Sequence, residues 1–154
     1  MLQVSGNRGT KVFDTYTLQP GDVQTILRYV QERDAVAHNA NFEVLWARDA
    51  GVELRLDDTM IQSRVLYGGT ETFKQLRHSL ADVAERELEV ELDKTEQTSD
   101  WSGQLTEEQL EYAKTDAEIT RTLYYRLQKR LREEQLEATY SRPRTSSRTA
   151  SARR

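Results

Sequence analysis

Tyr112-Ala113-Lys114-Thr115-Asp116 lies inside the longest helical pattern of this 154-residue chain. Tyr112 and Asp116 are four residues apart, so on a helix their side chains lie one above the other on the same face. Asp116 also belongs to the inward-facing stripe of that helix, which contains Ala113, Thr120, Leu123, Leu127 and Leu131. A carboxylate on an inward face must be paired, hydrated or bound to a metal, because an unpaired buried charge is costly. The stretch therefore predicts a site in which a tyrosine hydroxyl lies beside a carboxylate.

Length and composition favour one folded domain followed by a basic tail. The residues from Ala138 to Arg154 include no Val, Ile, Leu, Phe or Trp, and they carry five arginines without an acidic residue. Residues 1–137 therefore hold all 26 Asp and Glu and 17 of the 22 Lys and Arg, a net charge of −9. We expect a folded domain over 1–137 and a disordered basic tail over 138–154. The tail is either a solvated end or an electrostatic arm for nucleic acid.

The composition also excludes several classes of protein. The chain contains no cysteine, which rules out disulfides and thiolate metal sites. No apolar run approaches the roughly 20 residues that cross a membrane, so no membrane partner is expected. The start, Met1-Leu2-Gln3-Val4-Ser5, lacks the basic and apolar regions of a signal peptide. A soluble cytoplasmic protein is therefore the expectation.

The order of predicted elements is typical of an α/β fold with a helical second half. The Gly6-Asn7-Arg8-Gly9 turn, flanked by β-branched and aromatic residues, predicts a β-hairpin. Thr106-Glu107-Glu108-Gln109 matches a capping box, so the long helix is expected to run from there to about Glu137. Helical spacing and turn signals predict the remaining elements, which are helices from Pro20, after Asn39, over Thr59–Leu66 and from Ser79, and short strands over Asp34–Ala37 and Leu54–Leu56.

The segment from His38 to Glu43 follows a predicted strand and leads into a helix. Such a turn lies at the carboxyl end of a strand, where open α/β folds bind ligands. Asn39 is expected to be the N-cap of the helix, and Phe42 is expected in the core. Glu43 lies in the first helical turn, where the helix dipole favours an acid with or without a functional role. His38 on its own is either a ligand or a hydrogen-bonded core residue.

Several short motifs, taken in order, resemble the DEDDy class of 3′–5′ exonucleases, which includes the proofreading domain of family A DNA polymerases and ribonuclease D-like enzymes. They are His38-Asn39-x-x-Phe42-Glu43, Asp58-Thr59-Met60, His78–Ala84 with Lys94 and Ser99-Asp100-Trp101, Leu105–Ala113, and Tyr112-x-x-x-Asp116. The resemblance covers roughly residues 1 to 132. It implies a ribonuclease H-like fold, in which a mixed sheet is flanked by helices.

The resemblance also implies a chemistry. The family hydrolyses phosphodiester bonds from a 3′ end with two divalent cations, Mg²⁺ or Mn²⁺, which are hard ions that prefer carboxylate oxygens. By resemblance, Asp116 binds the metal that holds the attacking water, Tyr112 orients that water, and Glu43 is the middle carboxylate, where the family usually has Asp. The matching motif places His38, Asn39 and Phe42 among the substrate-binding residues. Single-stranded DNA and RNA both remain open as substrates.

The beginning of the sequence departs from the family pattern. The family's first strand carries an Asp-x-Glu motif, and Leu2-Gln3-Val4-Ser5 matches the strand that follows it. We therefore expect the first strand and two of four carboxylates to be missing, so that Glu43 and Asp116 supply half the charge needed for two metals. One interpretation is a truncated exonuclease domain, whose partner is a missing N-terminal segment or a polymerase module. The alternatives are a non-catalytic nucleic-acid-binding or regulatory relic, and a remnant without function.

Overall fold

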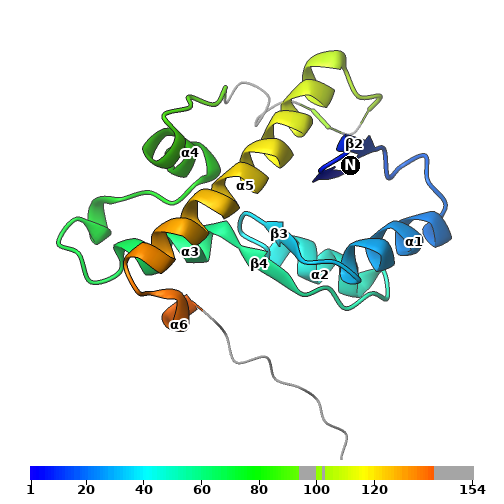
Figure 1. The fold of residues 1–154 in the computed structure, drawn as a ribbon. Coiled ribbons are helices and arrows are strands. Elements are labelled where there is room, and N and C mark those ends of the chain that lie inside the picture. The colour runs from blue at the N-terminus through cyan, green and yellow to red at the C-terminus, as the bar shows by residue number, and fades with distance from the viewer. Residues whose placement is uncertain (94–99, 102, 141–154) are drawn as a thin grey trace, which may run out of the picture.

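The helix α5 (Glu107–Glu133) is the element against which most others pack in this computed structural model, which describes residues 1–93, 100–101 and 103–140. Its start is the capping box expected from the sequence. The Thr106 hydroxyl accepts the Gln109 amide at 3.2 Å, and the Gln109 side chain accepts the Thr106 amide at 3.1 Å. The buried face of α5 includes the five stripe residues Ala113, Thr120, Leu123, Leu127 and Leu131. The helix contacts both strand pairs and the helices α3, α4 and α6 (Figure 1).

The expected β-hairpin is present and lies against the first half of α5. Its strands β1 (Leu2–Gly6) and β2 (Gly9–Phe13) are antiparallel, with Gly6 opposite Gly9. Gly9 has φ +106, a left-handed conformation that glycine adopts without steric cost and that closes the turn tightly. The Thr10 hydroxyl donates to the Glu118 carboxylate at 2.7 Å, which fixes the hairpin to the helix.

The second strand pair packs on α5 through its first strand. Strand β3 (Ala35–Ala37) runs parallel to β4 (Leu56–Asp58), with Ala37 opposite Asp58. The expected strand at Leu54–Leu56 therefore begins two residues later, because Leu54 is buried in a core cluster and pairing with β3 starts only at Leu56. That cluster contains Val23, Leu27, Ala47, Val52 and Leu54, from the helices α1 (Pro20–Gln31) and α2 (Asn41–Asp49) and the segment after them.

The helix α2 ends at a glycine in the left-handed conformation. Gly51 has φ +79, its N–H bonds to the Arg48 carbonyl at 2.9 Å, and the Val52 N–H bonds to the Ala47 carbonyl at 2.8 Å. These two bonds form a Schellman motif, which satisfies the free carbonyls at the helix end and needs a left-handed residue.

A second core cluster lies where α3 and α4 pack on the C-terminal half of α5. It contains Leu66, Val83, Ala84, Leu123, Leu127 and Leu131. The contributing and neighbouring elements are α3 (Thr59–Tyr67), the short 3-10 helix η1 (Phe73–Gln75), α4 (Leu80–Leu88) and α6 (Glu137–Tyr140). Ser79 caps α4 by accepting the Asp82 amide, as the sequence predicted for a helix that begins there.

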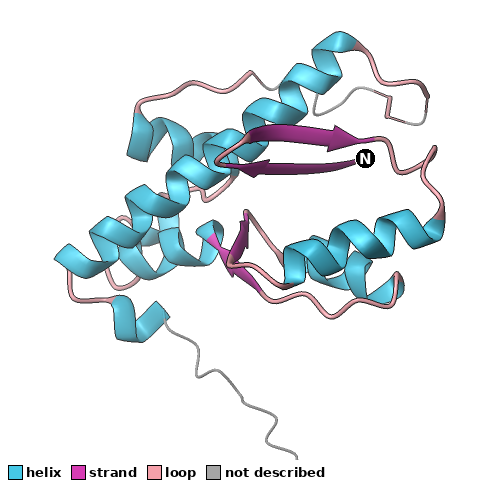
Figure 2. Ribbon diagram, turned by 45° about the vertical axis from the view of Figure 1, so that its right-hand side comes forward, coloured by secondary structure: helices cyan, strands magenta, loops and turns pink. Residues whose placement is uncertain are grey.

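The fold class is the expected α/β arrangement of small sheets and flanking helices. Among the described residues the strands form two separate two-stranded sheets, β1–β2 and β3–β4, with α5 passing both of them. Figure 2 shows the two strand pairs on the same side of this helix, with β1, which starts at the N-terminus, nearer to the β3–β4 pair than β2 is.

The division into a folded domain over 1–137 and a tail over 138–154 stays a prediction. The short helix α6 spans that boundary and contacts α3 and α5. The remaining tail, 141–154, lies outside the described residues. No helix in the described part of the chain is long and apolar enough to cross a membrane.

Candidate active site

The side chains of Tyr112 and Asp116 meet on α5. The Tyr112 hydroxyl donates a hydrogen bond to the Asp116 carboxylate, as the four-residue spacing on a helix allows. The Tyr112 ring also lies 6.1 Å from the Trp101 ring, measured between centroids, in a tilted arrangement. This aromatic contact connects the segment before α5 to the first turns of that helix and restrains the tyrosine.

Partial burial changes the acidity of Asp116. Desolvation raises the pKa of its carboxyl, and the hydrogen bond from Tyr112 acts in the opposite direction. A carboxylate in this position has lost part of its hydration, so a cation that approaches it meets less competition from water. Asp116 can therefore supply an oxygen ligand to a hard divalent ion.

Glu43 is the second half-buried carboxylate and lies in the first turn of α2. Its Oε2 atom is buried without a hydrogen-bond partner among the described residues. Burial raises the pKa of Glu43, the hydrogen bond from its own backbone N–H lowers it, and the nearby charge of Asp58 raises it again. An oxygen that has lost water without gaining a donor is a suitable ligand for a cation.

These two carboxylates form an incomplete ligand set. The charge of Asp116 is not among the causes that shift the pKa of Glu43, and the charge of Glu43 is not among those that shift the pKa of Asp116. Within the described ranges, no group of three or more His, Asp and Glu side chains is placed to hold a metal ion. Glu43 and Asp116 can each donate oxygen, but a site for two divalent ions needs further ligands.

His38 is integrated into the protein through both ring nitrogens. Nε2 lies 2.9 Å from the His78 carbonyl and must donate to it, and Nδ1 lies 2.8 Å from the Thr59 hydroxyl. Burial lowers the pKa of His38, although the His78 carbonyl and the charge of Asp58 act against this effect. The ring is therefore neutral near pH 7 and joins the end of β3 to the segment before α4. Any contact with a substrate would use its ring carbons or its backbone.

Asn39 does not cap α2, so the expectation from the sequence is wrong. It has φ +62, because the chain turns sharply between β3 and α2 and asparagine tolerates the left-handed conformation. Ala40 occupies the cap position, and its side chain makes no capping bond. The free amides of Asn39 and Ala40 donate instead to the carboxylate of Asp58, at 3.0 and 2.9 Å.

Phe42 is also placed differently from the expectation, since it is 73% exposed rather than in the core. The apolar residues of α2 do not lie on one face, because Leu45 is 51% exposed while Ala47 is fully buried. An exposed aromatic ring one residue before Glu43 is free to stack on a nucleobase, which keeps the predicted substrate-binding role available.

Only part of the role of Asp58 could be predicted from the sequence. Its position directly before a predicted helix is a recognisable N-cap signal, and it does accept the amides of Met60 and Ile61 at the start of α3. Its second role, at the start of α2, joins residues 18 and 19 positions apart and depends on the pairing of β3 with β4.

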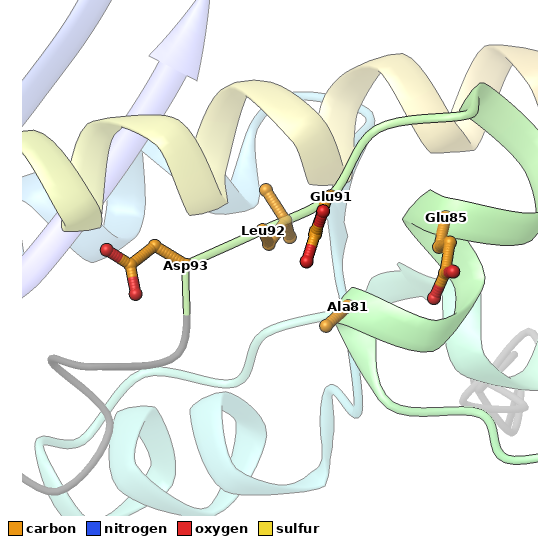
Figure 3. A pocket seen from close by; sticks show the side chains of 5 residues that line it. All are labelled: Ala81, Glu85, Glu91, Leu92 and Asp93. Atoms are coloured by element: carbon orange, nitrogen blue, oxygen red, sulfur yellow. The ribbon is translucent and has the colours of Figure 1, made fainter.

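A separate hollow of about 530 Å³ lies beside α4. Its lining consists of Ala81, Glu85, Glu91, Leu92 and Asp93 (Figure 3). None of these residues belongs to the candidate site, and three of the five carry a negative charge. Such a lining repels a phosphate backbone, so this hollow is not a suitable site for nucleic acid.

Comparison with a solved structure defines the class of protein. The structure, described as the apo form of a nuclease, matches this chain with a TM-score of 0.66 and 27% sequence identity. The match covers 75% of this chain and 56% of the nuclease chain. Together with the half-buried carboxylates, it defines a nuclease-like α/β domain, consistent with the expected ribonuclease H-like fold.

The family follows from the sequence comparison. A family model described as 3′-5′ exonuclease matches residues 1–132, and this chain belongs to that family. DNA polymerase I of Aquifex aeolicus (strain VF5) is 33% identical over 135 residues. That match covers 86% of this chain but only 22% of the polymerase, so the chain spans about a fifth of the length of this relative.

Proposed function

We propose that this chain contributes the Tyr112–Asp116 half of a 3′–5′ exonuclease site, which hydrolyses phosphodiester bonds at the 3′ end of single-stranded DNA or RNA. The observation that carries the proposal is the hydrogen bond from the Tyr112 hydroxyl to the half-buried Asp116 carboxylate. Both residues lie in the range 1–132 that matches the exonuclease family. Nucleic acid as the substrate class is supported by the similarity to a DNA polymerase I.

The proposed chemistry assigns one role to each side chain. Asp116 and Glu43 supply oxygen ligands to divalent ions, Mg²⁺ or Mn²⁺, which would lower the pKa of a bound water and stabilise charge on the leaving oxygen. The Tyr112 hydroxyl, held beside Asp116, orients the attacking water. The exposed Phe42 ring stacks on a base near the 3′ end, and Asn39 and His38 hold the turn beside it.

The remaining ligands must come from elsewhere. We infer that a strand carrying the Asp-x-Glu motif pairs with β1 and β3, either from another segment of a longer polypeptide or from a separate polymerase-linked chain. Two features support this inference. The described strands form two separate pairs that pack on one helix, and Glu43 retains an oxygen without a partner.

The test is a digestion assay with 5′-labelled single-stranded DNA and RNA in Mn²⁺ or Mg²⁺, using the chain alone and the chain with a supplied Asp-x-Glu strand. We expect stepwise shortening only when the strand is present. Asp116→Ala should abolish digestion, and Tyr112→Phe should slow it by about 10²-fold, the usual scale for one positioned proton-transfer or water-orienting group. Tyr125→Phe is the matched control, because Tyr125 is an exposed tyrosine of the same helix. Full activity in Asp116→Ala would contradict the assignment.

A second function is favoured by one observation, the incomplete ligand set of the described residues. In this alternative the chain binds nucleic acid without hydrolysing it. The same oligonucleotides distinguish the two functions. Binding that persists in EDTA, together with no digestion in Mn²⁺ even with the supplied strand, supports the non-catalytic role. Titration calorimetry with Mn²⁺ adds a direct check, since two tight sites in the chain alone would contradict the need for further ligands.

A further inference from the structure

The Asp58 carboxylate joins the N-termini of two helices. Oδ1 accepts the amides of Asn39 at 3.0 Å, Met60 at 2.8 Å and Ile61 at 3.4 Å, and Oδ2 accepts the amide of Ala40 at 2.9 Å. Asp58 is only 8% exposed, so these backbone donors replace the water that its carboxylate would otherwise bind. The Asp58 carboxylate therefore fixes the position of the first turn of α2 relative to the first turn of α3.

The backbone of Asp58 is held in turn by the last described residue. The Tyr140 hydroxyl accepts the Asp58 N–H at 3.0 Å and donates to Asp57 Oδ1 at 3.0 Å. The Tyr124 hydroxyl donates to the other oxygen of Asp57 at 3.1 Å. Tyr124 thus holds the same carboxylate as Tyr140 does, but only Tyr140 contacts the Asp58 amide.

Both tyrosines remain protonated donors over the physiological range. Burial raises the pKa of Tyr124 to about 12, and the charge of Asp57 adds to the effect. Burial also raises the pKa of Tyr140, and the negative charge of Asp57 acts in the same direction. The hydrogen bonds to Asp57 are therefore charge-assisted, which makes them stronger than bonds between neutral groups.

We propose that Tyr140 is a positioning residue, which fixes the N-terminus of α2, and with it Glu43, through the Asp57–Asp58 backbone. The connection runs from α6 to the end of β4, across the Asp58 carboxylate to the Asn39 and Ala40 amides, and into the first turn of α2. It joins residues 82 positions apart in the sequence. That Glu43 matters for hydrolysis rests on the proposed function, whereas the mechanical coupling does not.

The test is amide hydrogen exchange by NMR in Tyr140→Phe, which keeps the ring and removes only the hydroxyl. We expect exchange to accelerate by about fivefold or more at the Asp58 amide, and also at Asn39 and Ala40, because one hydrogen bond in the chain is lost. The amides of Leu123 and Leu127 in the α5 core report global opening and should not change. The carboxyl carbon resonance of Glu43 should shift as well.

The matched control is Tyr124→Phe, which removes a hydroxyl from the same Asp57 carboxylate and leaves the Asp58 amide bonded. This variant should leave exchange at Asn39 and Ala40 and the Glu43 resonance unchanged. The coupling is wrong if Tyr140→Phe accelerates Asp58 alone, or if it accelerates the α5 core equally. None of these outcomes depends on nuclease activity, so an inactive but coupled protein contradicts only the proposed function.

Discussion

The Glu43 side chain destabilises the folded protein when no cation is bound, and the same property makes it a suitable cation ligand. Its Oε2 is buried without a partner in the described structure, and burial raises the pKa of its carboxyl. Since the folded pKa lies above the unfolded one, the folded state binds the proton more tightly. The contribution of protonated Glu43 to the free energy of unfolding is fully present below the unfolded pKa, and it is lost as pH rises through the folded pKa.

Replacement of Glu43 by Gln should therefore remove a pH-dependent penalty. We expect Glu43→Gln to gain stability relative to the unmodified chain as pH rises from 4.5 through the folded pKa, with the two proteins converging below pH 4.5. Urea unfolding across this range measures the difference. Glu53→Gln is the control, because Glu53 is an exposed acid and the change removes the same charge. A difference independent of pH would show that charge at residue 43 carries no penalty.

Phe42 and Asn39 show where residue-level prediction stops. Phe42 was expected in the core, but the side of α2 that faces the core depends on how α2 packs against α1, and Phe42 lies in solvent. The capping preference of asparagine was a sound local argument. It failed because Asn39 adopts the left-handed conformation, and a carboxylate from the strand paired with β3 accepts the amides of Asn39 and Ala40.

At the scale of the elements, α4 and α5 are joined by a buried ionic contact. Glu87 of α4 has a side chain only 1% exposed, and its Oε1 accepts hydrogen bonds at 2.7 Å from both Arg130 and the Tyr67 hydroxyl. Arg126 and Arg86 lie 3.9 and 4.0 Å from the same carboxylate. A buried carboxylate surrounded by cations is costly to remove, because the cations then lose their counter-charge.

Glu87→Ala should therefore destabilise the protein by about 3 kcal/mol, the lower end for breaking a buried ion pair. Glu87→Gln should cost less, since it keeps a hydrogen-bond acceptor. The control is Glu133→Ala, which removes the exposed partner of Lys129 at 3.7 Å and should cost about 0.5 kcal/mol or less. Chemical denaturation gives all three values, and equal losses at residues 87 and 133 would contradict the role of the buried contact.

Several element boundaries were predictable because their signals are local, although α5 ends at Glu133 rather than near Glu137. The capping box at Thr106, the Ser79 cap and Gly51 at the end of α2 each act within a few residues. Strand β4 begins two residues later than predicted, because its start depends on pairing with β3. The helix α6 was not predicted, because four residues carry no usable periodicity.

At the scale of the whole molecule, the core formed by the described residues is divided into two clusters. One joins α3, α4 and α5 around fully buried leucines, and the other joins α1, α2 and the segment that leads to β4. The second cluster is supported by a pair of three-residue strands. Such short pairs contribute little independent stability, so this half should open first.

The Trp101→Phe variant makes this separation measurable, because it leaves Trp46, which packs against the second cluster, as the only tryptophan. We expect the Trp46 fluorescence transition in urea to precede the far-UV circular dichroism transition, which α5 dominates, by about 0.5 M. A supplied strand that pairs with both β1 and β3 should bring the two midpoints together. Coincident transitions in the chain alone would show that the two clusters unfold as one cooperative unit.

The sequence by itself determined the family, the class of fold and the meeting of Tyr112 with Asp116, because motif order and helical spacing are properties of the chain read locally. Tertiary structure alone decided the exposure of Phe42, the double capping by Asp58 and the reach of Tyr140 to β4. The physical reason is that these features depend on which surfaces pack and which strands pair. Such contacts join residues far apart in the chain, and no local pattern records them.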